Sequence, residues 1–158
     1  MWKRNTAAVL FTILVIFAAA GFFYNTTSPW QLVVYTPKNG QILHRFPLEK
    51  EAAFSLHYIH SVTQREVSGT FTVTVDGKIK PLTTTFDAYG PGLPVLDGSL
   101  HFIQKGGAYI VFHEEEPRPH IGLFVSPLTG ERLVCKTGEL DLSGFSKDPQ
   151  LVHIVAEK

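Results

Sequence analysis

Apolar and polar residues alternate in short runs along most of the chain, which is the pattern of half-buried β-strands. The clearest run is residues 66–75, where Val67, Phe71, Val73 and Val75 share one face and threonines fill most of the other. Ten prolines and thirteen glycines separate the runs, which favours many short strands over helices. We predict an all-β fold, an antiparallel sandwich or barrel-like domain of about eight to ten short strands. The predicted strands cover residues 31–36, 41–46, 53–61, 66–75, 79–86, 100–104, 108–113, 121–126, 132–136 and 151–155.

The first predicted hairpin turns at Asp76 and Gly77. A two-residue turn would set Val75 opposite Lys78 and mix a buried face with a solvated one. A three-residue loop sets Val75 opposite Ile79 and keeps the apolar faces together. We therefore predict the longer, bulged loop.

A second hairpin is marked by Gly106 and Gly107, which adopt positive φ at little cost. A two-residue turn at these glycines pairs Ile103 with Ile110. The neighbouring pair on the opposite face is also apolar, so we expect this hairpin to lie inside the sheet and not at its edge.

The N-terminal part of the chain has a different pattern, an apolar run over residues 7–24 that follows Lys3 and Arg4. A helix of this length just spans the hydrocarbon core of a bilayer, and basic residues on its N-terminal side place that end in the cytoplasm. We predict a cytoplasmic N-terminus at 1–5, a single-pass transmembrane helix at 6–24, a spacer at 25–31 and an extracytoplasmic β domain at 32–158. A signal peptide cleaved behind Ala20 is the alternative.

Charge and cysteine content narrow the partners of the exported part. Beyond the apolar run, twelve basic and fourteen acidic residues remain, a net charge of 12 − 14 = −2 with neutral histidines, so nucleic acid is not an expected partner. The single cysteine, Cys135, cannot form an intramolecular disulfide. Its neighbours Leu133 and Val134 favour a buried, small apolar role.

Strand alternation gives His60 an unusual environment. Three large apolar side chains share its face of the strand: Phe54, Leu56 and Tyr58. Such a histidine either lines a binding pocket or lies in the core with its ring hydrogen-bonded to a backbone carbonyl or a hydroxyl. His57 and Ser61 point the other way, so neither a shared metal ion with His57 nor a nucleophile and base pair with Ser61 is expected.

Residues 87–94 form a loop in which glycine and proline alternate closely. Together they specify one backbone path, which either directs amide groups toward a ligand or forms a rigid crossover between two sheets. In the first case we expect His60, Ser61 and Tyr89 to converge near this loop.

Residues 113–120 contain a further polar cluster, with three consecutive glutamates between His113 and Pro117. Carboxylates and imidazoles bind divalent cations, but a proline-flanked run of this kind is more typical of a solvated loop. We predict no metal and no cofactor.

Two motifs carry a family resemblance: the triplet His60, Ser61, Val62 with the alternating strand that follows it, and the loop of Tyr89, Gly90, Gly92, Leu93 and Pro94 after a second strand. In these motifs the chain resembles a small bacterial family known as a domain of unknown function, number eighteen-fifty. The chain departs from the family pattern at Gly69, where an acidic residue is common, and at Glu66, where proline is common.

The resemblance implies one N-terminal hydrophobic segment, a short extracytoplasmic domain and an accessory role beside TAXI-class TRAP transporters, with no established enzymatic activity. The expected partners are the transporter membrane subunit or its solute-binding protein. The candidate residues for binding a ligand or partner are His60, Ser61, Glu66, Tyr89, Gly90, Gly92 and Pro94.

Three functions follow from these observations. We expect a membrane-anchored extracytoplasmic accessory or regulatory binding module. A small-ligand or metal-binding β domain that uses His60 and the glycine and proline loop is the alternative. An exported hydrolase is the third, although the sequence shows no catalytic constellation.

Overall fold

The computed structural model describes residues 27–49, 52–145 and 147–158. These residues form eleven β-strands and one short 3-10 turn, η1 (Ser143–Phe145). The strands are β1 (Thr27–Thr36), β2 (Gln41–Glu49), β3 (Ala53–Ile59), β4 (Glu66–Val73), β5 (Ile79–Phe86), β6 (Phe102–Lys105), β7 (Ala108–Phe112), β8 (His120–Val125), β9 (Arg132–Cys135), β10 (Gly138–Asp141) and β11 (Gln150–Glu157).

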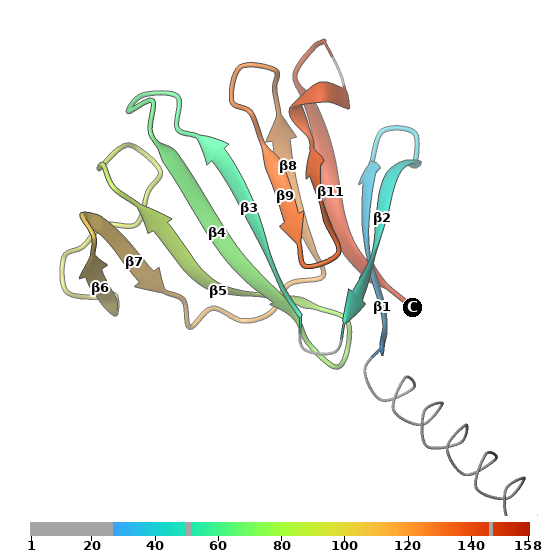
Figure 1. The fold of residues 1–158 in the computed structure, drawn as a ribbon, viewed down its shortest axis with the longest axis horizontal. Helices are drawn as coiled ribbons and strands as arrows, with labels where there is room; N and C mark the ends of the chain where they lie inside the picture. The colour runs from blue at the N-terminus through green and yellow to red at the C-terminus, as the bar shows by residue number, and fades with distance from the viewer. Residues whose placement is uncertain (1–26, 50–51, 146) are drawn as a thin grey trace, which may run out of the picture.

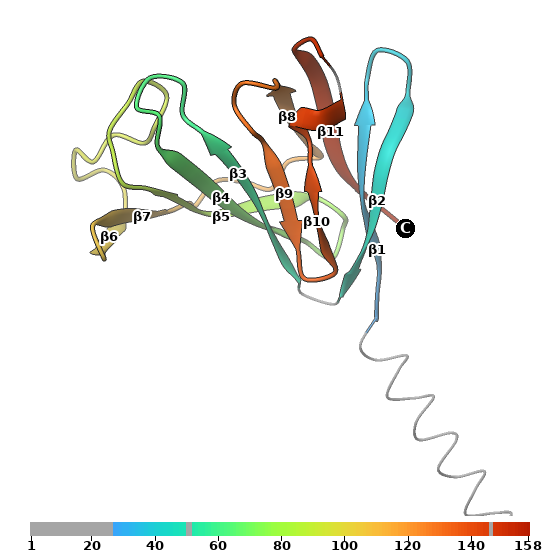
Figure 2. The same cartoon turned by 45° about the horizontal axis from the view of Figure 1, so that its top comes forward.

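The strands build two antiparallel sheets, which Figures 1 and 2 show from two directions. The four-stranded sheet has the order β2-β1-β11-β8, and the seven-stranded sheet has the order β10-β9-β3-β4-β5-β7-β6. The predicted all-β, antiparallel sandwich is therefore confirmed. The strand that the sequence did not predict is β10, which has four mostly polar residues and pairs with β9 across a turn at Lys136 and Thr137.

The predicted cytoplasmic N-terminus at 1–5 and transmembrane helix at 6–24 lie outside the described residues. Within the described part of the chain, no helix has the length and apolar character needed to cross a bilayer. Strand β1 begins at Thr27, within the segment predicted as a spacer at 25–31 and before the predicted domain start at 32.

The main core lies between the two sheets, as the alternation of each strand requires. The four-stranded sheet contributes Leu32, Val34 and Ile154, and the seven-stranded sheet contributes Phe54 and Leu133. A second cluster packs under the segment between β5 and β6, where Val67, Phe86, Leu93 and Val111 are buried.

Cys135 belongs to the main core, which confirms its predicted role as a buried, small apolar residue. Burial raises the pKa of its thiol to about 11, because a thiolate in apolar surroundings loses its hydration.

The register predicted for the first hairpin is wrong. Val73 and not Val75 lies opposite Ile79, and the side chain of Val75 is 96% exposed. Thr74 closes the loop earlier than predicted, since its amide donates to the Lys78 carbonyl at 2.8 Å and its hydroxyl donates to Asp76 at 2.6 Å. The loop does contain three residues, but they are 75–77.

The second hairpin has the predicted two-residue turn, with Lys105 opposite Ala108 and Ile103 opposite Ile110. Its predicted position inside the sheet is wrong, because β6 is the edge strand. The segment before β6 packs over the face of the sheet and does not add a further strand. The side chain of Ile103 is consequently exposed.

Candidate functional site

His60 joins two loops that are far apart in the sequence. It follows β3 directly, and its side chain is only 7% exposed. Its Nε2 lies 3.0 Å from the carbonyl oxygen of Pro91, while its Nδ1 accepts from the amides of Val62 at 3.3 Å and Thr63 at 3.2 Å. This geometry places the ring proton on Nε2. The imidazole thus connects the β3–β4 loop (residues 60–65) to the glycine and proline loop (residues 87–94), and we call this pair of loops the corner.

Gly90 is needed at the corner because His60 packs directly against it. A Cβ atom at Gly90 would lie 2.5 Å from Cε1 of His60 and 3.1 Å from Cγ2 of Thr63. Gly92 has a different role, since its φ of +85° favours glycine although nothing lies within 4 Å of its missing side chain. The turn closes through the amide of Leu93, which donates to the Gly90 carbonyl at 3.2 Å.

A surface ion pair ties the same two loops together a second time. Nε of Arg65 donates to both carboxylate oxygens of Asp87, at 3.1 and 3.0 Å, and its Nη2 also contacts Asp87. The hydrogen bonds and charge of Arg65 lower the pKa of Asp87 below its ordinary value, because they favour the ionised carboxylate. The corner is therefore held by one buried contact and one exposed contact.

Two clefts lie beside the corner, on the face of the seven-stranded sheet that also carries the main core. One has a volume of about 430 Å³ and the other about 400 Å³. Tyr58 and Gly92 line both clefts, so we treat them as one corner groove. The first part is lined by Tyr58, Ile59, His60, Ser61, Pro91, Gly92, Leu123, Phe124, Ser126, Thr129 and Glu131. The second part is lined by Tyr58, Thr84, Gly92, Leu93, Pro94, Leu100, His113 and Glu115.

Polar groups in the corner groove are held by hydrogen bonds to neighbouring groups. The buried carboxylate of Glu131 accepts from the amide of Ser126 at 3.1 Å and from the hydroxyl of Thr129. In the second part, Oγ1 of Thr84 lies 2.8 Å from Nε2 of His113. Two carboxylates line the groove, and no lysine or arginine does. The groove thus combines apolar walls with an excess of acceptors.

Exposed apolar side chains lie on β8 and on the two loops next to residues that line the corner groove. Val62 in the β3–β4 loop and Phe124 on β8 are each 66% exposed, and Leu128 in the β8–β9 loop is 91% exposed. Figure 1 shows these two loops at the same end of the molecule, opposite the start of β1. Apolar side chains gathered around a groove are typical of an interaction surface.

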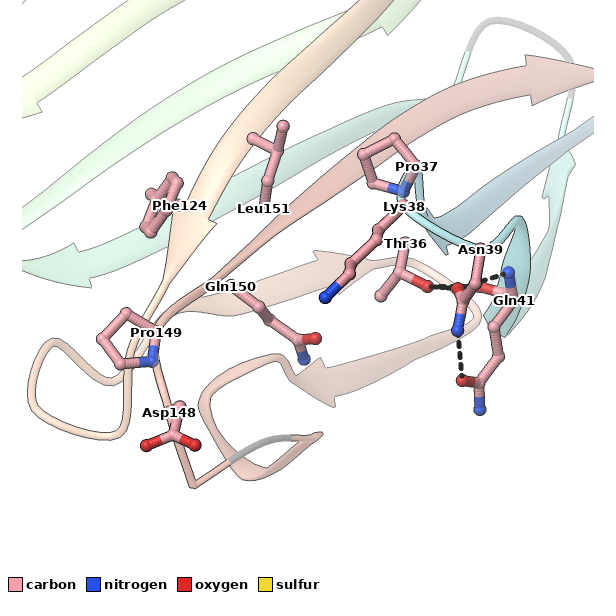
Figure 3. A pocket seen from close by; sticks show the side chains of 10 residues that line it. All are labelled: Thr36, Pro37, Lys38, Asn39, Gln41, Phe124, Asp148, Pro149, Gln150 and Leu151. Atoms are coloured by element: carbon pink, nitrogen blue, oxygen red, sulfur yellow. Dashed lines mark hydrogen bonds between the residues drawn. The ribbon is translucent and has the colours of Figure 1, made fainter.

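A third cleft of about 660 Å³ lies on the other side of Phe124 (Figure 3). It lies between the β1–β2 turn and the start of β11, where Lys38 and Gln150 project into it. Thr36 donates to Asn39 within the turn, and Asn39 donates to Gln41 at 3.5 Å. Its polar lining is therefore largely turn structure that is bonded to itself.

The structure brings most of the predicted site residues to the corner. His60, Ser61, Gly92 and Pro94 line the groove, and Gly90 supports the ring of His60.

Two predicted site residues do not line the groove. Tyr89 lines neither part of the groove and packs instead against the rings of Phe86 and Tyr109, with centroids 5.8 and 5.1 Å away. A hydrogen bond with Tyr109 raises the pKa of Tyr89. Glu66 begins β4 and bonds to His57, on the sheet face opposite the groove.

Glu66 belongs to a hydrogen-bond chain that the sequence did not reveal. Oγ of Ser55 lies 2.9 Å from Nε2 of His57, and Nδ1 of His57 lies 2.7 Å from Oε1 of Glu66. The order is that of a serine hydrolase triad. However, β3 pairs with β4 on one side and β9 on the other, so its amides are not free to stabilise an oxyanion. None of these three residues lines any of the three clefts.

The acidic cluster after β7 also contributes to the groove. Glu115 lines its second part, contacts Arg118 and lies 3.6 Å from Nδ1 of His113. Within the described residues, no group of three or more histidine, cysteine, aspartate or glutamate side chains is placed to hold a metal ion. Thr84, His113 and Phe124 become groove residues through the strand order and the packing of the two sheets, which the sequence does not reveal.

Comparison with known proteins gives one match. A family model described as Domain of unknown function (DUF1850) matches residues 54–142. No curated protein and no solved structure matches the chain. The matched range includes every residue that lines the corner groove, whereas Phe124 is the one residue of the third cleft within it.

Proposed function

Since the chain belongs to the DUF1850 family of domains of unknown function, we propose that it is a membrane-anchored extracytoplasmic binding module with an accessory or regulatory role beside a transporter. The observation that carries this proposal is the corner groove with its exposed apolar rim. The family motifs build one wall of this groove, and Phe124 and Leu128 extend its apolar surface into solvent. An exposed apolar surface beside a groove is typical of a binding site for another protein.

The partner is the transporter membrane subunit or its solute-binding protein, in a system of the TAXI-class TRAP type, as the resemblance implies. The predicted anchor at residues 6–24 keeps the domain at the membrane. Tethering raises the effective concentration of the domain near a membrane-bound partner, so a modest interface is sufficient. The two loops that carry Val62 and Leu128 lie at the end of the domain away from the start of β1 (Figure 1).

Site-specific photo-crosslinking tests the proposal with a matched pair of positions. Val62 and Val75 are exposed valines at opposite ends of β4, but only Val62 lies at the corner. A photoreactive amino acid replaces each of them in turn in the full chain, in cells that express the transporter. We expect Val62 to crosslink to the membrane subunit or the solute-binding protein and Val75 to give no such product. Equal crosslinking from both positions, or none to either protein, would contradict the proposal.

A second candidate function is the binding of a small ligand in the corner groove. Each part of the groove lies within the roughly 300 to 1,000 Å³ of typical ligand pockets. The bonded pair of Thr84 and His113 together with Tyr58 supplies polar groups at fixed positions. A ligand whose free concentration is about 100 times its dissociation constant stabilises the fold by about 2.7 kcal/mol. Thermal shift assays of the full chain against a panel of small organic acids test this function, and a panel without any shift counts against it.

A further inference from the structure

Edge strands differ in how well they resist pairing with another chain, and β8 is the least protected of the four edges in the described part of the structure. Strand β2 carries Arg45 and Pro47, β6 has four residues and ends in Lys105, and β10 has four residues including Glu139 and Asp141. Charged side chains, proline and short length all discourage edge pairing. Strand β8 has six residues with the sequence HIGLFV, without proline, lysine, arginine or a carboxylate.

The free edge of β8 has unused backbone groups. The strand pairs with β11 from Val125 opposite Gln150 to His120 opposite Val155, and it lies at the end of the four-stranded sheet. No other backbone hydrogen bond of residues 120–125 exists within the described chain. Alternate amides and carbonyls on this side are therefore available to a further strand.

The corner groove borders β8. Leu123 and Phe124 of β8 line it together with Tyr58 of β3 and with Pro91 and Gly92 of the glycine and proline loop. A strand that pairs with β8 lies about 4.8 Å from it. A single extended segment paired with β8 can therefore also contact the lining of the groove.

The lining of the groove defines the chemistry of that segment. Leu123, Leu100 and Leu93 offer apolar contacts, and Glu131 and Glu115 are the charged residues among the lining side chains. Glu131 is buried and hydrogen-bonded, whereas Glu115 contacts Arg118 but is about half exposed. Because no lysine or arginine lines the groove, a segment with apolar residues and a lysine or arginine that reaches Glu115 is electrostatically complementary to it. An added strand presents alternate side chains to this surface.

We infer that the free edge of β8 binds an extended, apolar and basic polypeptide segment of the partner protein as a fifth strand of the four-stranded sheet. This inference rests on the proposed binding function and specifies how the partner is held. Main-chain hydrogen bonds supply general affinity, and the groove selects the side chains.

Hydrogen exchange on the full chain tests this inference with a defined probe. Phage-displayed peptides of about twelve residues are selected on the detergent-solubilised protein, and the selected peptides are synthesised. We expect sequences in which apolar residues alternate with lysine or arginine. Their binding should slow the exchange of alternate amides between Ile121 and Phe124 at least about tenfold, and it should leave β2 and β6 unchanged. Selection of no peptide, or binding without protection of β8, would overturn the inference.

Edge variants provide the matched control. Leu123 lines the groove and also packs against the main core. Leu123→Lys places a charge at this position of β8 and should weaken peptide binding at least about tenfold. Ile103→Lys places the same charge on the β6 edge and should change binding less than about twofold. If Leu123→Lys lowers the melting temperature of the protein, the exchange pattern of the unsubstituted chain decides instead.

The two proposals fail in different ways. If Val62 crosslinks to a transporter component but Leu123→Lys leaves the affinity for that component unchanged in a folded protein, the strand addition is wrong and the binding function stands. If peptides protect β8 but neither transporter protein crosslinks, the proposed partner is wrong.

Discussion

The contact between His60 and Gly90 gives the sharpest prediction about the corner. Gly90→Ala introduces a methyl group that would lie 2.5 Å from Cε1 of His60. The ring cannot easily move away, because Pro91, Val62 and Thr63 hold it by three hydrogen bonds. Overpacking of this kind destabilises a protein by about 1 to 3 kcal/mol. We expect Gly90→Ala to lower the free energy of unfolding by about 2 kcal/mol.

His60→Ala should by itself lower the free energy of unfolding. It removes three hydrogen bonds, each worth about 1 kcal/mol net. Water reaches part of the exposed β3–β4 loop and replaces some of this loss, so we expect about 2 to 3 kcal/mol in total. The substitution also removes Cε1 and Nε2 of His60, the two atoms nearest to a Cβ at position 90. It leaves the 3.1 Å contact with Cγ2 of Thr63, which a shift of a few tenths of an ångström relieves.

A double-mutant cycle combines the two changes. In the His60→Ala background, Gly90→Ala should cost less than about 0.5 kcal/mol, so the two effects should depart from additivity by about 1.5 kcal/mol. For a domain of this size, about 1 kcal/mol corresponds to roughly 4 °C in melting temperature. Calorimetry and urea unfolding both resolve this difference.

Gly92→Ala is the matched control for the cycle. Its cost of about 1 kcal/mol comes from a φ of +85° and not from contact with His60. It should therefore add to the cost of His60→Ala within about 0.5 kcal/mol. If Gly90→Ala is also additive with His60→Ala, the packing of the histidine against this loop does not explain the glycine.

Three further predictions concern acid stability, thiol reactivity and catalysis. The lowered pKa of Asp87 means that its ion pair with Arg65 stabilises the fold above the unfolded carboxyl pKa of about 3.9, and this contribution is lost as the pH falls through the folded pKa. The difference in unfolding free energy between the natural protein and Arg65→Gln should therefore shrink between about pH 6 and pH 2 in urea titrations. A constant difference would contradict the assignment. The thiol of Cys135 is buried and its pKa is raised to about 11. It should therefore react with iodoacetamide at about pH 8 only as the protein unfolds. Fast labelling under native conditions would contradict its buried position. Ser55 lacks oxyanion donors, so a fluorophosphonate probe should label the natural protein no more than Ser55→Ala, and stoichiometric labelling of Ser55 would instead support the hydrolase hypothesis.

Alternation in the sequence predicted the faces of strands better than it predicted their partners. It placed His60 with Phe54 and Leu56, and all three are buried. It failed at Val75, because side-chain hydrogen bonds of Thr74 and not hydrophobic pairing determine where the loop begins. Strand β10 gave no periodic signal because four residues contain a single large apolar side chain.

The site was predictable only in part, because its contacts span long distances in the sequence. The carbonyl that binds His60 belongs to Pro91, which is 31 residues away. Leu123 and Phe124 come from β8, which belongs to the other sheet, and their position near Tyr58 of β3 follows from the packing of the two sheets, which local pattern does not encode. His60 was expected either to line a pocket or to lie in the core with a hydrogen-bonded ring, and the structure combines the two. Its ring is hydrogen-bonded to backbone groups and also lines the groove.

The affinity of the crosslinked transporter protein for the full chain tests the binding function most directly. Phe124→Ser removes an exposed ring from the rim of the corner groove, and Val75→Ser removes an exposed valine from the opposite end of the domain. Loss of an apolar contact at the centre of an interface costs about 1 to 2 kcal/mol, which is about fivefold to thirtyfold in affinity. We predict a loss in this range for Phe124→Ser and a change below about twofold for Val75→Ser. Equal affinity for the natural protein and Phe124→Ser, or a greater loss for Val75→Ser, would contradict binding at the corner groove.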